Sequence, residues 1–213
     1  MNKKDLPKII PIFPLSNFII FPNTTVPLNI FEPRYIEMVD NCMKDNRIIG
    51  LIQPKKNGDL KKPDLYKIGC AGKIISFNET DDGRYLIVVN GICRFKIINE
   101  EKNNKIYREC CVQFDEYFED LKINNKETNF SDLKLIFRDL KNLFKKHGYI
   151  INWKEIEKQS LDQTINTLSM ASPFSLEEKQ VLLESKNLST RKEKLEEIIK
   201  TYIVDNFSNS TLQ

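Results

Sequence analysis

The sequence predicts an α+β protein in which a strand-rich first part is followed by a bundle of helices. Eight of the nine prolines and six of the seven glycines lie within the first 91 residues, where short apolar runs alternate with turn residues. That pattern is typical of β-strands joined by tight turns. Later in the chain, apolar residues recur every three or four positions, which is the spacing of amphipathic helices. The chain has 213 residues, which suits one domain or two small ones.

The stretch at residues 12–35 predicts three short strands separated by prolines, followed by a helix at about 33–44. It reads IFPLSNFIIFPNTTVPLNIFEPRY. Proline lacks the N–H group that pairs neighbouring strands, so the third strand, residues 26–30, should lie at a sheet edge or begin at Pro27. Pro33 suits the first position of a helix, where the N–H group needs no partner within the helix.

The rest of the first part predicts a small barrel or a curled sheet. The polar segment 54–63 indicates a surface loop, and Gly69 and Gly72 indicate a bulge or a corner within a strand. The Asp-Gly pair ending at Gly83 predicts a tight hairpin turn, and the Asn-Gly pair ending at Gly91 predicts a bend. Five further runs have the composition of strands: residues 47–53, 65–77, 85–89, 93–97 and 106–117.

The second part is predicted to be helical. Ser175-x-x-Glu178 and Thr190-x-x-Glu193 have the pattern of capping boxes, which begin helices. The predicted helices cover residues 130–146, 154–171, 176–184 and 191–207. The chain is therefore expected to divide into a β-rich part (9–118), a polar linker (119–128), a helical bundle (129–207) and a disordered tail (208–213).

The charge and the cysteines argue against several classes of protein. The 33 basic residues nearly balance the 30 acidic ones, and the net charge of +3 does not by itself indicate a nucleic-acid-binding protein. The five cysteines are an odd number without C-x-x-C spacing, which argues against a disulfide framework and against a zinc site. The sequence shows no signal peptide and no long uncharged apolar run, so we expect a cytoplasmic protein without a membrane span.

Known catalytic motifs are missing from the sequence. The sole histidine, His147, lies at the end of a predicted helix, where a structural role is the common one. The sequence contains no H-E-x-x-H, P-loop or G-x-S-x-G motif. We therefore expect a protein that is not an enzyme and that holds neither a metal nor a cofactor. An enzyme with an unrecognised active site stays open, and it would need a deep cleft with converging carboxylates.

Three segments resemble one known family. Residues 13–35 have the pattern F-P-L-x-N-x-x-x-F-P-x-x-x-x-P-L-x-I-F-E-P-R-Y, which resembles the start of the Lon substrate-binding domain, the N-terminal domain of the ATP-dependent Lon protease. Gly91, Arg94 and Phe95 fill the G-x-x-R-F pattern of the family's central segment, and E-K-Q-x-x-L-E at 178–184 resembles its last two helices. The closest resemblance is to stand-alone proteins that lack the ATPase and protease modules. It implies a PUA-like barrel followed by a helical bundle.

The resemblance also implies a function. The protein is expected to recognise unfolded or degron-bearing polypeptides as an adaptor, with an ATP-dependent protease as a partner in trans. Phe31, Arg34 and Tyr35 are the candidate contacts, as an apolar pocket with a cationic rim. The alternative is structural: Phe31 and Tyr35 belong to the core, and Arg34 binds a carboxylate or carbonyl groups at the junction of strand and helix.

A basic stripe on the predicted helix 130–146 offers an alternative function. PUA-like barrels elsewhere often bind RNA, so this stripe could follow a phosphate backbone. We favour a solvated helix face and regard nucleic acid as the weaker hypothesis, because no aromatic residue interleaves with the stripe for base stacking. The sequence does not indicate an oligomeric state. The stripe consists of Lys134, Arg138, Lys141 and Lys145.

Overall fold

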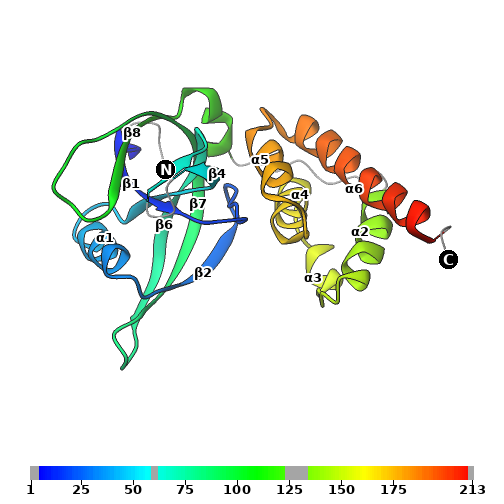
Figure 1. Cartoon of the computed structure of the whole chain (residues 1–213), viewed down its shortest axis with the longest axis horizontal. Helices are drawn as coiled ribbons and strands as arrows, with labels where there is room; N and C mark the ends of the chain where they lie inside the picture. The colour runs from blue at the N-terminus through cyan, green and yellow to red at the C-terminus, as the bar shows by residue number, and fades with distance from the viewer. Residues whose placement is uncertain (1–4, 59–61, 123–133, 211–213) are drawn as a thin grey trace. The chain divides into compact units, whose positions relative to one another are not determined.

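A computed structural model describes residues 5–58, 62–122 and 134–210 of the chain (Figure 1). It divides into two compact units, Met1–Ile123 and Asn124–Gln213. The first unit is built mainly from strands and the second from helices, so the predicted α+β class is confirmed. No helix within the described ranges is both long enough and apolar enough to cross a membrane.

A six-stranded sheet that closes on itself forms the first unit. The strand order is β2-β7-β6-β3-β1-β8, and β8 also pairs with β7. Only β1 and β3 run parallel. The first half of β7 pairs with β2 and the second half with β8, so five strands close a barrel and β2 lies outside the closure. The strands are β1 (Ile9–Pro14), β2 (Thr25–Ile30), β3 (Ile48–Ile52), β6 (Ile68–Glu79), β7 (Tyr85–Glu100) and β8 (Arg108–Gln113).

The barrel interior is centred on Phe95, which is fully buried. Two glycines make room for its ring: a Cβ atom on Gly50 or Gly69 would lie 3.0 or 2.6 Å from the Phe95 Cζ atom. A bulge does interrupt β6, but it lies at Ile75, between Ile74 and Ser76, and not at the predicted glycines. The register shift beside Gly72 leaves the extra residue, Ile92, on β7. Gly83 has φ +76° in the β6–β7 turn, as the Asp-Gly pair predicted.

Pro27 lies on an edge strand of the sheet, as predicted. Of the strands that the structure describes, only β7 pairs with its strand, β2. The Gly91 N–H group donates to the Thr24 carbonyl, and antiparallel pairing alternates along a strand. The backbone of Pro27 therefore faces away from β7, at a position where a missing N–H group breaks no ladder bond.

The polypeptide between these strands corrects two predictions. Helix α1 (Pro33–Met43) begins at Pro33, as predicted. The predicted surface loop 54–63 instead begins with a strand, β4 (Pro54–Gly58), which pairs with β5 (Pro63–Leu65). The apolar run at 18–21 is buried from residue 19 onward but forms no strand, because the Thr24 hydroxyl donates to the Phe21 carbonyl (2.6 Å) and closes a turn.

The chain does not leave the sheet at Gly91, since β7 continues from Tyr85 to Glu100, but a bulge at Ile92 directly follows this glycine. Gly91 is needed for another reason: a Cβ atom there would lie 2.1 Å from the Phe21 carbonyl oxygen. Arg94 of this strand is buried together with Asp120. The strand predicted for 106–117 begins at Arg108 and ends at Gln113, and the 3-10 helix η2 (Asp115–Leu121) follows.

The second unit contains α2 (Lys134–Lys146), α3 (Trp153–Ile156), α4 (Leu161–Ala171), α5 (Leu176–Glu184) and α6 (Leu188–Ser210). The capping box of Ser175 and Glu178 is confirmed. The helix predicted for 154–171 is two helices, because Ser160 and Gln163 form a capping box that starts α4. The last helix starts before Thr190, and the Asn187 side chain accepts the Thr190 N–H group instead (2.9 Å).

Some residues of the predicted linker, first helix and tail lie outside the part of the chain that the structure describes. The expected linker, 119–128, begins inside η2, and its residues 123–128 lie outside the described residues, as do 130–133 of the first predicted helix. In the expected tail, residues 208–210 continue α6, and residues 211–213 lie outside the described residues.

Candidate functional site

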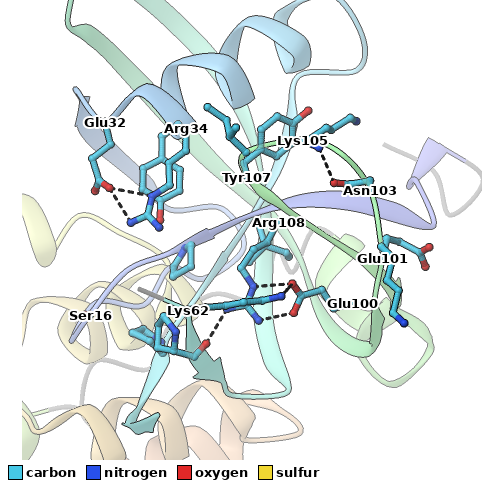
Figure 2. Close-up of a pocket in the computed structure, with 17 residues that line it drawn as sticks. Ser16, Glu32, Arg34, Lys62, Glu100, Glu101, Asn103, Lys105, Tyr107 and Arg108 are labelled. Atoms are coloured by element: carbon cyan, nitrogen blue, oxygen red, sulfur yellow. Dashed lines mark hydrogen bonds and ion pairs between the residues drawn. The ribbon is translucent and has the colours of Figure 1, made fainter. Parts of the chain in front are cut away.

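A pocket of about 730 Å³ lies in the first unit (Figure 2). Its walls come from four places that are distant in sequence: strand β1, the start of α1, the β4–β5 segment, and the end of β7 with the loop that leads to β8. Glu32, Arg34 and Tyr35 lie at the α1 wall. The motif at the start of the sequence therefore supplies one side of a hollow whose other sides come from the rest of the barrel.

Arg108 organises the opposite wall. Its guanidinium group binds both carboxylate oxygens of Glu100, at 2.6 and 3.2 Å, and donates to the Pro63 carbonyl (2.7 Å). The Lys62 Nζ atom lies 2.9 Å from the same Glu100 carboxylate. Burial alone would raise the pKa of Glu100, but the hydrogen bonds and charges of Arg108 and Lys62 outweigh it and lower that pKa. A bidentate contact of this kind fixes the positions of Arg108 and Glu100 in the pocket wall.

Tyr35 and Arg34 form the α1 wall together. The Tyr35 ring is buried and packs edge-on against Phe13, with 4.4 Å between ring centroids. Burial raises the pKa of the Tyr35 hydroxyl, and the Arg34 charge offsets part of that rise. The Arg34 guanidinium carbon lies 4.6 Å from the Tyr35 ring centroid, and Glu32 binds the same guanidinium group (2.7 Å).

Phe31 does not join the other two candidate residues. It is 64% exposed and is not one of the residues that line the pocket. Its ring faces the β6–β7 turn, where the Arg84 guanidinium carbon lies 6.0 Å from the ring centroid. Tyr35 is thus buried and Arg34 binds a carboxylate, both within the pocket wall, whereas Phe31 belongs neither to the core nor to the pocket.

The third side of the pocket comes from the loop between β7 and β8. Lys105 binds Glu109 (2.7 Å), and its Nζ atom lies 5.4 Å from the Tyr107 ring centroid. The Asn103 side chain accepts the Lys105 N–H group (3.0 Å) and orders the loop, as Figure 2 shows. Of the basic side chains that line the pocket, only Lys102 has no carboxylate partner among the described residues.

The charged and apolar side chains that line the pocket are suited to binding a ligand. Five basic and three acidic side chains line it, so positive charge is in excess. Most of these charges are already paired and therefore held in place, beside apolar surface from Tyr35, Tyr107, Ile106 and three prolines. Such a site offers both fixed hydrogen-bonding groups and apolar contact, which is the usual make-up of a ligand pocket.

Neither metal nor thiol chemistry is indicated for the described part of the chain. It contains no group of three or more His, Cys, Asp or Glu residues placed to hold a metal ion. Burial raises the pKa of Cys42 and of Cys93 to about 12 and that of Cys110 to about 11. These thiols are therefore protonated at neutral pH, and a protonated thiol is a poor nucleophile.

The basic stripe on α2 is partly neutralised. Arg138 binds Asp139 (2.9 Å), and Lys141 lies 3.4 Å from a Glu157 carboxylate oxygen. Lys145 is exposed, and the side chain of Lys134 lies outside the described part. One aromatic residue of another helix lies beside the stripe: the Trp153 ring centroid on α3 is 5.4 Å from the Lys141 Nζ atom. The same ring packs edge-on against Phe137 and Phe144.

Sequence reasoning missed most of the pocket. Lys62, Glu100 and Arg108 were not candidates, because each looks like an ordinary surface charge in its own segment. Arg108 lies 45 residues from Pro63, to which it donates, so no local pattern relates them. The one usable signal was the motif around Arg34 and Tyr35.

The comparisons with known proteins agree on one family. The family model described as the ATP-dependent protease La (LON) substrate-binding domain matches residues 9–201. The chain is 27% identical to the Lon protease of Flavobacterium johnsoniae over 201 residues, which are 90% of this chain and 24% of that protein. It is 29% identical to Lon protease 2 of Myxococcus xanthus over 100 residues, which are 46% of this chain and 12% of that protein. The chain thus spans a quarter or less of these relatives.

Two solved structures share the fold. The Lon N-terminal domain protein from Xanthomonas campestris superposes with a TM-score of 0.63 and 19% identity, covering 88% of this chain and 96% of that one. The N-terminal domain of the Mycobacterium avium complex Lon protease gives a TM-score of 0.61 and 16% identity, covering 91% and 98%.

Proposed function

This chain belongs to the family of ATP-dependent protease La (LON) substrate-binding domains, and we propose that it is a non-catalytic module that binds polypeptides at the pocket between β1, α1 and β8. The observation that carries this proposal is the position of Arg34 and Tyr35. The motif that resembles the start of the family's domain puts both of them in the wall of a pocket of about 730 Å³.

The pocket's lining favours a polypeptide over a small charged metabolite. Apolar and aromatic side chains alternate there with charged groups of both signs. A polypeptide carries apolar side chains, carbonyl groups and carboxylates on one flexible chain, and it can satisfy such a mixed surface. The excess of basic groups favours segments that carry at least one acidic residue.

The proposal extends to the state of the polypeptide and to its fate. Unfolded or degron-bearing chains are the proposed ligands, because they expose segments that a folded protein buries. An adaptor role, with an ATP-dependent protease as the partner in trans, is supported by the family's name and by its relatives. A reducing, cytoplasmic setting is part of the proposal, supported by five free cysteines.

RNA binding through α2 is the second candidate function. The position of Trp153 beside Lys141 favours it, since an aromatic ring next to a cation can stack on a base. The pairing of Arg138 with Asp139 and of Lys141 with Glu157 weighs against it, because each pair removes a charge that a phosphate would need.

A fluorescence-anisotropy titration separates the two functions. The probe is a fluorescein-labelled polypeptide that has been reduced and alkylated so that it cannot refold, and unlabelled RNA is the competitor. Micromolar binding that persists in RNA and in moderate salt is the expected result. Absence of binding would contradict the proposal, and binding that RNA abolishes would favour the helix α2 function.

A further inference from the structure

The distal half of β6 has an edge to which no described strand is bonded. The Thr80 N–H group donates to the Arg84 carbonyl (2.9 Å), so residue 80 faces β7. Antiparallel pairing alternates, and the register continues through Asn78↔Leu86 and Phe77↔Ile87. The backbone groups of Asn78 therefore face β7, whereas the N–H and C=O groups of Phe77 and Glu79 face away from it.

The neighbouring strand stops before it covers this edge. Pairing of β3 with β6 ends at Ile48↔Lys73, and the last bond on this side joins the Ile74 N–H group to the Arg47 carbonyl (2.8 Å). Arg47 has φ +63°, a conformation that turns the chain sharply and that non-glycine residues seldom adopt. Beyond Ile74, no strand within the described ranges pairs with this side of β6.

The side chains along the edge are exposed and suited to a strand. Ile75 is 56% exposed and Phe77 is 38% exposed, although both are apolar. The Phe77 ring packs edge-on against Tyr85, with 4.8 Å between centroids, which leaves its outer side open. The turn that ends this hairpin extends away from the rest of the first unit (Figure 1).

The two open edges of the sheet differ in their protection by proline. Proteins commonly prevent strand addition by placing proline on an edge. Edge strand β2 has Pro27 at an outward-facing position. The segment 75–79 of β6 contains no proline. A bulge lies at its first residue, Ile75, and the regular register resumes at Ser76, before the outward-facing groups of Phe77 and Glu79. The contrast between two edges of one sheet singles out the distal edge of β6 as a place where a strand can be added.

We propose that the distal edge of β6, residues 75–79, binds an extended segment of polypeptide as an added β-strand. The chemistry of the edge specifies this occupant, because free N–H and C=O groups in alternation are complementary to another extended backbone. Main-chain recognition is largely independent of sequence, as binding of unfolded chains requires. The inference rests on the proposed polypeptide recognition and adds a second surface outside the pocket.

Charge at the end of the edge indicates which segments bind best. Glu79 and Asp81 are exposed next to the hairpin turn, and neither forms an ion pair with another described residue. Asp82 is already bound to Arg84. The preferred segment is therefore β-branched or aromatic where it lies beside Ile75 and Phe77, and basic where it passes Glu79.

Hydrogen exchange followed residue by residue by NMR tests the proposal on the unaltered protein. The probe is the reduced and alkylated polypeptide used in the anisotropy titration. The amides of Phe77 and Glu79 should exchange at least about tenfold more slowly when the polypeptide is bound, because strand addition gives both a hydrogen-bond partner. The amides of Thr25 and Asn29, on the other open edge, should not change.

Variants provide the second measurement. Phe77→Pro removes an outward-facing N–H group without removing a bond to β7, and it should weaken polypeptide binding by about tenfold. Phe77→Ala keeps the N–H group and should weaken binding less. Asn29→Pro makes the same backbone change on the protected edge and should leave the affinity unchanged.

Failure of this inference can be told apart from failure of the proposed function. If the polypeptide binds but exchange at Phe77 and Glu79 stays the same, the edge is not the site, whereas polypeptide recognition stands. If the unaltered protein binds no polypeptide, both proposals are wrong. Protection of these amides without polypeptide that grows with protein concentration would mean that a second copy occupies the edge, and it would also overturn the inference.

Discussion

The guanidinium group of Arg94 on β7 binds both carboxylate oxygens of Asp120 in η2. The Arg94 Nε and Nη2 atoms each lie 2.8 Å from a carboxylate oxygen, and the Arg94 N–H group adds a third bond of 3.0 Å. The two side chains are only 2% and 11% exposed. The guanidinium carbon also lies 4.2 Å from the Tyr117 ring centroid. This ion pair therefore connects η2 to β7, the strand that carries the G-x-x-R-F pattern.

Loss of Asp120 should be costly. Asp120→Ala leaves the Arg94 charge buried without its carboxylate, and we expect the free energy of unfolding to fall by about 3–5 kcal/mol. Urea denaturation followed by circular dichroism measures this change. The matched control is Glu116→Ala, which removes an exposed partner of Lys96 between the same two elements and should cost less than about 1 kcal/mol. Equal losses in the two variants would contradict the account of the buried pair.

Gly91 should tolerate no side chain. In Gly91→Ala the new Cβ atom would lie 2.1 Å from the backbone oxygen of Phe21, so the chain at residues 18–24 would have to move. We expect a loss of more than about 2 kcal/mol, measured by thermal unfolding. Gly83→Ala is the comparison, since nothing lies within 4 Å of its Cβ position and only its φ of +76° is unfavourable. That variant should lose about 1–2 kcal/mol, and a reversed order would contradict this view of Gly91.

The cysteines should differ in reactivity. Cys42, Cys70, Cys93 and Cys110 are buried, and burial raises the pKa of each thiol, whereas Cys111 is partly exposed. Brief treatment of the folded protein with iodoacetamide at neutral pH should modify Cys111 first, because only the thiolate reacts. Peptide mass spectrometry identifies the modified residue. Labelling of Cys93 before Cys111 would be incompatible with the structure, and unfolding in urea should equalise all five.

Glu100 should make stability depend on pH. Its folded-state pKa lies below the ordinary value of 4.5, so the unfolded protein takes up a proton first as the pH falls. The stabilisation is therefore present above about pH 4.5 and is lost as the pH falls through the folded-state pKa. In urea titrations at a series of pH values, the stability advantage of the unaltered protein over Glu100→Gln should shrink below that point. A stability advantage over Glu100→Gln that grew as the pH fell would contradict the lowered pKa of Glu100.

Features that depend on a few neighbouring residues could be predicted from the sequence. The positive φ of Gly83, the edge position of Pro27 and the capping box that begins with Ser175 each follow from the chemistry of one short segment. Arg34 and Tyr35 were found because they lie in a recognisable motif.

Features that depend on distant partners could not be predicted. The apolar run at 18–21 has the composition of a strand, but the Thr24 hydroxyl closes a turn directly after it, and Gly91 packs closely against the Phe21 backbone. Arg94 alternates with apolar residues along its strand, as a surface residue would, but Asp120, 26 residues away, pairs with it and both are buried. The wall of the pocket formed by Lys62, Glu100 and Arg108 exists only once the barrel brings the three segments together.

The central claim is that polypeptides bind at the pocket between β1, α1 and β8. Two charge reversals test it most directly, Arg34→Glu in the pocket and Arg138→Glu on α2. The two arginines are comparable, because each side chain is accessible, 42% and 67% exposed, and each binds one neighbouring carboxylate. The readout is the dissociation constant of the unfolded polypeptide by anisotropy. We predict that Arg34→Glu weakens binding by about tenfold, equivalent to about 1.4 kcal/mol, and that Arg138→Glu changes it less than about twofold. The claim would be contradicted if Arg34→Glu bound as tightly as the unaltered protein, or if Arg138→Glu alone lost binding.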